Sequence, residues 1–201
     1  MNEAGVLKDQ DLFIKSLRQE TAENHQKLEE NRLSKALLEP TVTLSDYQAY
    51  LSGLYGVTVS CENQVFPLLN HIFPDLSERY KSGFILNDLK TTGYSDTQID
   101  SLPVYEFGFL SVPDALGVMY VLEGTTLGGR ILYKHIHETL GLTEDNGARY
   151  FWGYGPQTGV LWKSFISVFA RFSAESNEGP AIISNAKKTF TLIDNWLTGS
   201  I

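Results

Sequence analysis

The amino-acid sequence predicts an all-α fold: a multi-helical bundle of seven or eight helices that forms a single domain. Along most of the chain, apolar residues recur at spacings of three and four, which is the periodicity of a helix with one buried face. No segment has the strict alternation of apolar and polar residues that is typical of a half-buried strand. The length of 201 residues lies within the range that one hydrophobic core supports.

The first predicted helix begins at about Asp11 and ends near Leu28. Its apolar face carries residues at spacings of three, four, four and three: Ile14, Leu17, Thr21, His25 and Leu28. We therefore expect His25 to point inward, because it shares a face with two leucines. Residues 1–10 are polar and acidic, so we expect an N-terminal tail there, followed by one domain over residues 11–201.

The later helices follow from the same periodicity and from helix boundary signals. They are predicted over residues 31–38, 45–69, 77–88, 113–140, 158–172 and 180–197. Pro67 interrupts the second of these, Pro113 suits the first turn of the long central helix, and Gly141 suits its end. Turn-forming residues are dense over 91–103 and 144–159, and we expect both segments to be irregular.

Composition and charge exclude several classes of protein. Hydrophobic residues make up 42% and charged residues 20% of the chain, which is the composition of a folded protein rather than a disordered one. The formal net charge of −8 disfavours binding to nucleic acid or to an anionic membrane surface. Neither a secretory signal nor a membrane-spanning apolar run is visible. A single cysteine, Cys61, excludes an intrachain disulfide and fits a reducing compartment, so we expect a cytoplasmic protein.

The first candidate site is His25 together with Arg18. Arg18 precedes His25 by two helical turns, which places it about 10 Å along the helix on nearly the same face. This spacing suits a haem, since an imidazole nitrogen can bind the iron while a cation pairs with a propionate. Each residue also has a simpler interpretation: His25 as a hydrogen-bonded core residue and Arg18 as an exposed charge.

The second candidate site is a group of glycines inside the long central helix. Each of these glycines lowers the stability of the helix by up to about 1 kcal/mol relative to alanine: Gly124, Gly128 and Gly129. Together they leave a flat stretch of backbone, against which either another helix or a flat ligand would pack. A local kink could also free backbone groups to hydrogen-bond a ligand or water.

Together these segments resemble the haem oxygenase family, and in particular the bacterial branch that supplies biliverdin to bacteriophytochromes. Residues 17–29, LRQETAENHQKLE, are similar to the family's proximal helix, with His25 at the iron-ligand position. Residues 120–129, YVLEGTTLGG, are similar to its glycine-rich distal helix. The aromatic segment over 151–169 is similar to the loop and helix that follow, and the resemblance covers residues 12–197 in order and spacing.

The resemblance implies a site and a reaction. Haem is then both cofactor and substrate, and O₂ with external electrons converts it to biliverdin, carbon monoxide and iron. The electrons would come from a ferredoxin or a reductase, because the chain lacks a nucleotide-binding glycine fingerprint. A bacteriophytochrome would be the acceptor of biliverdin. The residues expected on the catalytic, distal side are Gly124, Thr125, Gly128 and Gly129. The residues expected to bind haem are Arg18, Thr21, His25, Thr126, Lys163 and Phe165, with His25 as the iron ligand.

One position departs from the family pattern. Mammalian-type members carry an aspartate directly after the first distal glycine, and that aspartate holds the distal water network. This chain has Thr125 there, so Thr125, Thr126 or backbone groups would have to organise those waters.

Two other functions stay open at the level of sequence. A thiaminase-II-like hydrolase shares the fold class, and Cys61 beside Glu62 is its candidate nucleophile pair. A haem-binding or haem-storage protein without turnover is the second, because the distal aspartate is missing. His71, His135 and His137 are spare ligands that we expect at the surface or at helix ends.

Overall fold

The computed structural model describes residues 3–108 and 110–199 as a bundle of helices. The α-helices are α1 (Glu3–Glu30), α2 (Arg32–Ala36), α3 (Leu44–Ser60), α4 (Phe66–Leu69), α5 (Ser82–Thr91), α6 (Asp96–Asp100), α7 (Val112–Leu140), α8 (Arg149–Trp152), α9 (Thr158–Ser176) and α10 (Gly179–Gly199). A π-helical turn, η1 (Cys61–Val65), and two 3₁₀ turns, η2 (Leu76–Glu78) and η3 (Gly155–Gln157), complete them. Within the described ranges no β-strand is formed, so the predicted all-α class is confirmed.

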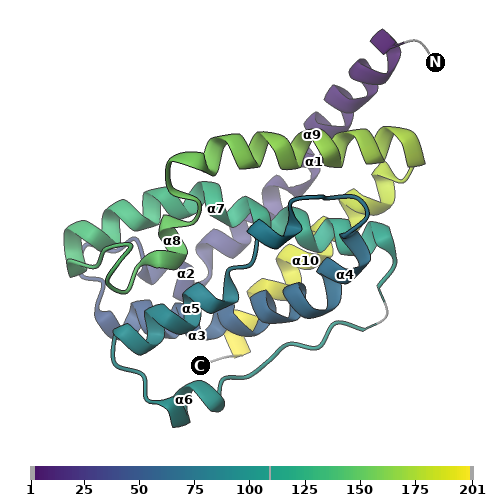
Figure 1. Cartoon of the computed structure of the whole chain (residues 1–201). Helices are drawn as coiled ribbons and strands as arrows, with labels where there is room; N and C mark the ends of the chain where they lie inside the picture. The colour runs from purple at the N-terminus through teal and green to yellow at the C-terminus, as the bar shows by residue number, and fades with distance from the viewer. Residues whose placement is uncertain (1–2, 109, 200–201) are drawn as a thin grey trace.

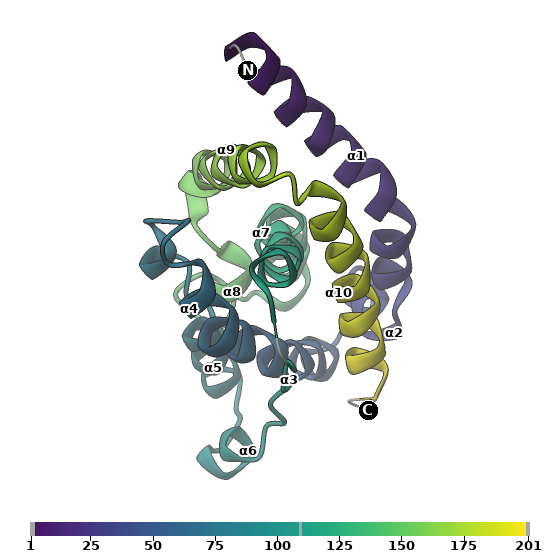
Figure 2. The ribbon, with the colours of Figure 1, turned by 90° about the vertical axis from the view of Figure 1, so that its right-hand side faces the viewer.

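Helix α7 is the axis of the bundle. Figure 2 shows it end-on, with α9, α10, α3, α4 and α8 around it and α1 on the outer side of α10. A capping box formed by Ser111 and Asp114 begins the helix, Pro113 lies in its first turn, and Gly141 ends it with a φ of 70°. The prediction of one helix over residues 113–140 is therefore confirmed.

Helix α1 begins earlier than the sequence pattern predicts. Residues 3–10, assigned above to a tail, continue α1 as helix, and only Met1 and Asn2 lie outside the described residues. This end of α1 extends beyond the bundle past α9 (Figure 2). Apolar periodicity cannot detect a helical extension without an apolar face, although adding turns to an existing helix costs little.

The segment predicted over residues 45–69 is one continuous helical rod with a wide turn in it. Thr43 and Asp46 form a capping box at the start of α3. After Ser60 the rod continues through η1 into α4, whose first turn accommodates Pro67. A π-helical turn shifts the register of the side chains that follow, and here it places Glu62 in the interior, where it is 5% exposed.

Short helices occupy both segments that were expected to be irregular. Helix α6 begins with a capping box made by Ser95 and Gln98. Helix α8 has no capping side chain at its own N-cap, Ala148. Helix α5 begins at Ser82, five residues later than predicted. None of the helices in the described part of the chain is long and apolar enough to cross a membrane.

Candidate active site

A cavity of about 490 Å³ lies between α1 and α7. Its volume is within the range of small-molecule and cofactor sites. Its walls come from seven helices and from the segment after α2: Arg18, His25, Leu28, Glu29, Ser34, Leu37, Leu38, Tyr50, Tyr120, Val121, Gly124, Thr125, Leu127, Gly128, Ile131, Leu132, Tyr150, Phe151, Trp162 and Phe190. Most of these residues are apolar or aromatic, as a site for a flat hydrophobic ligand requires.

His25 faces this cavity from α1. It points into the cavity, in line with the expectation of an inward-facing residue, and its side chain is 55% exposed rather than packed in the core. The ring packs edge-on against Phe190 of α10, with the ring centroids 5.4 Å apart. Nδ1 lies 3.7 Å from a carboxylate oxygen of Glu29. Both side chains are exposed, so solvent screens this interaction and it does not make Glu29 a strong ionic partner.

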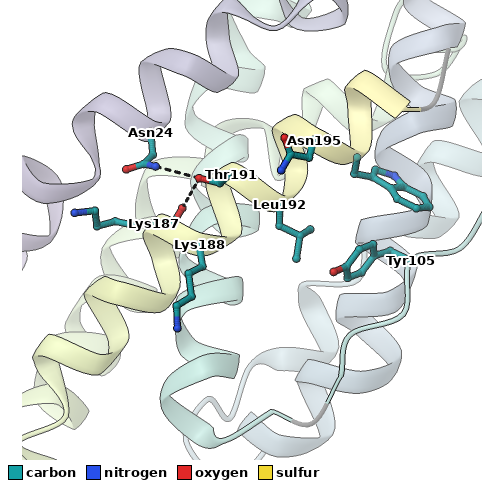
Figure 3. Close-up of a pocket in the computed structure, with 8 residues that line it drawn as sticks. Asn24, Tyr105, Lys187, Lys188, Thr191, Leu192 and Asn195 are labelled. Atoms are coloured by element: carbon teal, nitrogen blue, oxygen red, sulfur yellow. Dashed lines mark hydrogen bonds between the residues drawn. The ribbon is translucent and has the colours of Figure 1, made fainter.

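The wall that carries His25 is joined to α10 on its outer side. Asn24 Nδ2 donates a hydrogen bond to Thr191 Oγ1 at 3.1 Å, and Thr191 donates in turn to the carbonyl of Lys187 at 3.2 Å. Figure 3 shows these bonds in a surface groove between the two helices. Because Asn24 and Thr191 are next to His25 and Phe190 in sequence, the bond between them joins the two helices that carry the packed rings.

Arg18 lies at the edge of the same cavity, and Thr21 does not line it. Arg18 is exposed and also borders a groove between α1 and α9, so it is placed where a cation could meet an anionic group at the cavity mouth. Thr21 is 2% exposed and donates its hydroxyl hydrogen to the carbonyl of Leu17 at 2.7 Å. Tyr120 of α7 lines the cavity instead.

Gly124 and Gly128 present bare backbone to the cavity. Apart from neighbouring atoms of α7 itself, a Cβ added at Gly128 would meet no atom of the described chain within 4 Å, and one at Gly124 would meet only the Trp162 ring, at 3.9 Å. Helix–helix packing therefore does not account for these two glycines. The space that their side chains would fill is available to a ligand that lies flat against α7.

Gly129 differs from its neighbours, although the sequence grouped all three. A Cβ there would lie 3.2 Å from the carbonyl oxygen of Phe151, so Gly129 allows α8 to approach α7 and does not line the cavity. Gly117, nearer the start of α7, has the same kind of role: its Cβ would lie 2.7 Å from the backbone nitrogen of Ala186.

Of the two threonines after Gly124, the structure brings only Thr125 to the cavity. Thr125 Oγ1 donates to the carbonyl of Leu122 at 2.7 Å and lies 3.4 Å from the hydroxyl of Tyr150. Thr126 is 7% exposed, donates to the carbonyl of Glu123 at 2.7 Å and lies outside the cavity lining.

Lys163 and Phe165 do not line the cavity either. Lys163 is exposed on α9. Phe165 is fully buried and stacks on Phe73 with centroids 5.1 Å apart, so it belongs to the core. Trp162 lines the cavity from the same helix. The sequence pattern identified the helix but not its register, because a large aromatic side chain suits either position.

Tyr150 and Phe151 are site residues that the sequence analysis assigned to a loop. They belong to α8, and a buried carboxylate holds that helix in place. Asp88 accepts hydrogen bonds from the backbone N–H of Arg149 at 2.9 Å and of Tyr150 at 2.7 Å. Burial raises the pKa of Asp88 from its ordinary value of 3.8 to about 6, although these two bonds and Arg149 oppose the shift. No local signal marks this contact, because Asp88 is 61 residues away in sequence.

A second group that the sequence did not reveal is a buried charge cluster beneath α7. Glu123 forms ion pairs with Arg79 and with Lys81, the latter at 3.0 Å, and accepts a hydrogen bond from the Tyr154 hydroxyl at 3.0 Å. Arg79 also pairs with Asp75 at 2.6 Å. Glu62 accepts from the backbone N–H groups of Lys81 and Ser82 at 2.6 and 2.7 Å. Glu62, Arg79, Lys81 and Glu123 border a chamber of about 20 Å³.

Cys61 also borders this chamber and is 3% exposed. Burial is the main reason that the pKa of its thiol lies far above the ordinary value. A thiol that stays protonated is a poor nucleophile, so the hydrolase interpretation has no support from this site. The spare histidines are also outside the cavity: His135 and His137 bond to the carbonyls of Glu39 and Leu142.

Comparison with known proteins agrees with this geometry. The family model described as Heme oxygenase matches residues 11–198. Heme oxygenase PigA of Pseudomonas aeruginosa is 29% identical over 184 residues, covering 88% of this chain and 87% of that protein. Heme oxygenase of Leptospira interrogans is similar in structure, with a TM-score of 0.76, 19% identity and coverage of 93% of this chain and 98% of that one.

Two other solved structures have the same fold. The NO- and CO-bound heme oxygenase of Neisseria meningitidis has a TM-score of 0.74 and 21% identity, with 94% of this chain and 91% of that chain covered. Heme oxygenase-1 of the cyanobacterium Synechocystis, solved in complex with heme, has a TM-score of 0.68 and 19% identity, with coverage of 93% and 91%. Since the family model spans nearly the whole chain, this protein belongs to the heme oxygenase family, whose enzymes degrade haem.

Proposed function

We propose that the cavity between α1 and α7 is where this haem oxygenase binds and cleaves haem, with His25 as the residue that would bind the iron. The observation that carries the proposal is the pairing across one cavity of an imidazole on α1 with side-chain-free backbone at Gly124 and Gly128 on α7. A flat macrocycle fits between two such walls, because the missing side chains at the two glycines leave room for a ring that lies against the backbone of α7.

The chain's own residues suit haem in three ways. His25 supplies a nitrogen ligand, and Arg18 lies at the cavity edge, where it can pair with a propionate. The aromatic and aliphatic walls exclude water from the ring. When bound, haem supplies the iron that activates O₂ and the porphyrin that is oxidised. With haem in the cavity, the backbone at Gly124 and Gly128 would lie close to the ring and would direct a small ligand towards one edge.

Five of the residues expected from sequence lie outside the cavity lining and are not part of this proposed contact surface: Thr21, Thr126, Gly129, Lys163 and Phe165. Phe165, Thr21, Thr126 and Gly129 contribute to the packing that holds the walls, whereas Lys163 is exposed. The proposed distal side therefore consists of Gly124, Thr125 and Gly128 from α7 together with Tyr150 and Phe151 from α8.

The reaction that we propose needs O₂ and electrons from an external donor, a ferredoxin or a reductase, and releases biliverdin, carbon monoxide and iron. Supply of biliverdin to a bacteriophytochrome is part of the same proposal and rests on the resemblance of residues 17–29 and 120–129 to that branch of the family.

Turnover separates this function from storage of haem. The purified protein is loaded with one equivalent of hemin and supplied with O₂ and ascorbate or a reductase system. We expect the Soret band to disappear while the absorption of biliverdin grows. A Soret band that persists under these conditions, with the haem still bound, would indicate a storage protein.

A further inference from the structure

Two cavities of the molecule meet at one side chain. The first is the cavity between α1 and α7, called the haem cavity below, and the second is the small chamber bordered by Glu62 and Glu123. Within the described part of the chain only Tyr150 lines both. Its side chain is 6% exposed, and its hydroxyl lies 3.4 Å from Thr125 Oγ1. Because the Thr125 hydroxyl already donates to Leu122, the Tyr150 hydroxyl is the donor in this contact.

The chamber is suited to holding water. Its volume of about 20 Å³ exceeds the roughly 10–15 Å³ that one water molecule needs. Its lining includes Glu62, Glu123, Arg79 and Lys81, all at most 6% exposed. Two carboxylates and two cations cancel in formal charge, so the chamber offers hydrogen-bond donors and acceptors without a net buried charge. Arg79 in turn pairs with Asp75, which is 23% exposed and connects this cluster to solvent.

Tyr150 is held at both ends. Asp88 binds its backbone N–H at 2.7 Å, and Thr125 lies against its hydroxyl. Burial raises the pKa of the Tyr150 hydroxyl far above its ordinary value, so the group keeps its proton and acts as a hydrogen-bond donor. A fixed, protonated hydroxyl at the boundary of two cavities can exchange hydrogen bonds with water on both sides.

We propose that the Tyr150 hydroxyl relays protons between water in the buried chamber and the haem cavity. The inference rests on the proposed function of that cavity. In each step the hydroxyl gives its proton to an acceptor in the haem cavity and takes one from chamber water, and solvent at the Asp75 end of the cluster restores the proton of that water, so the O–H bond and charge of Tyr150 are unchanged. Thr125 orients the hydroxyl, and Asp88 is a positioning residue that acts through the backbone of Tyr150.

The central test is Tyr150→Phe, which removes one oxygen and keeps the ring. We expect hemin to bind with unchanged stoichiometry and biliverdin formation to slow at least about tenfold, as loss of a proton-transfer group does. Tyr94→Phe is the matched control: its hydroxyl forms a hydrogen bond with Ser52 at 2.8 Å and lines neither cavity, so this variant should keep the wild-type rate.

A second readout is independent of turnover. The C–O stretching frequency of carbon monoxide added to the reduced, hemin-loaded protein reports hydrogen bonding in the haem cavity. We expect the wild-type band to shift in D₂O, and in Tyr150→Phe we expect it to move to higher frequency and to lose that shift. Thr125→Val, which removes the partner of the hydroxyl but leaves Tyr150 in place, should change the band in the same direction.

The outcomes are distinct. A wild-type rate and an unchanged C–O band in Tyr150→Phe would overturn the proposal. If Tyr150→Phe does not fold, an unchanged rate and band in Thr125→Val would overturn it instead. Failure of the wild-type protein to bind hemin or to form biliverdin would contradict the proposed function itself, which these variants do not test.

Discussion

At the scale of single residues, the site depends on a few atoms whose surroundings set their chemistry. His25 could be found from sequence because its neighbours Leu17 and Leu28 follow local helical spacing. The carboxylate of Asp88 could not, because its two partners lie 61 and 62 residues away. A contact of this kind is created by the fold and leaves no local pattern.

The titration of Asp88 predicts a pH dependence of stability. Its pKa rises from 3.8 unfolded to about 6 folded, so between these values the folded chain holds more protons than the unfolded chain. Its contribution to the free energy of unfolding is therefore greatest below about pH 4 and falls as the pH rises through 6. The fall is about 3 kcal/mol, since one pKa unit corresponds to about 1.4 kcal/mol.

Urea unfolding of the wild type and of Asp88→Asn between pH 4 and pH 7 measures this contribution. We expect the unfolding free energy of the wild type, relative to that of Asp88→Asn, to fall as the pH rises from 4 to 7. A difference that is constant over the whole range would mean that Asp88 does not titrate there.

The buried charge of Glu123 predicts a large loss of stability on neutralisation. In Glu123→Gln the cations Arg79 and Lys81 lose their common partner in the interior, where an uncompensated charge costs about 3–5 kcal/mol. Chemical denaturation measures the loss. Glu138→Gln removes an exposed partner of Lys134 at 3.9 Å and should change stability by less than about 0.5 kcal/mol. Equal effects of the two substitutions would contradict this account of the cluster.

At the scale of elements, the glycines of α7 have two different roles on one helix. Gly117 and Gly129 allow α10 and α8 to approach, whereas Gly124 and Gly128 face the cavity. The sequence grouped Gly124, Gly128 and Gly129 but did not show which of them face the cavity. Which helix packs at a given position depends on the whole fold. The same reason explains why Trp162, and not Phe165, lines the cavity from α9.

Alanine substitution separates the two roles. Gly128→Ala should raise the free energy of unfolding by up to about 1 kcal/mol, because its Cβ meets no described atom within 4 Å and alanine favours the helix. Gly117→Ala should lower it by about 1–3 kcal/mol, because its Cβ would lie 2.7 Å from the backbone of Ala186. Thermal or urea unfolding distinguishes the two, and effects of the same sign would contradict the assignment.

A larger side chain at Gly128 tests the cavity wall. Gly128→Leu should leave the apo protein folded but weaken hemin binding or redirect the site of ring cleavage, since the leucine occupies space that we assign to haem. Spectroscopic titration and analysis of the biliverdin isomer measure these effects. Wild-type affinity, rate and isomer in this variant would exclude a ligand at that wall.

At the scale of the whole molecule, the sequence predicted the class of the fold and both walls of the cavity. The walls belong to α1 and α7, which are long helices with regular apolar spacing, and α7 also has clear signals at both ends. The parts that escaped prediction connect segments far apart in the chain: α8 with Asp88, the cluster around Glu123, and the start of α1 before Asp11. Periodicity describes one element at a time, whereas these features depend on packing between elements.

The most direct test of the central claim is a titration of the purified protein with hemin, carried out in parallel on the wild type and on His25→Ala. We predict that the wild type acquires one haem per chain with the absorption spectrum of a histidine-ligated iron, and that the variant loses this spectrum together with biliverdin formation. A wild-type spectrum and biliverdin yield in His25→Ala, or no saturable binding of hemin by the wild type, would contradict the account.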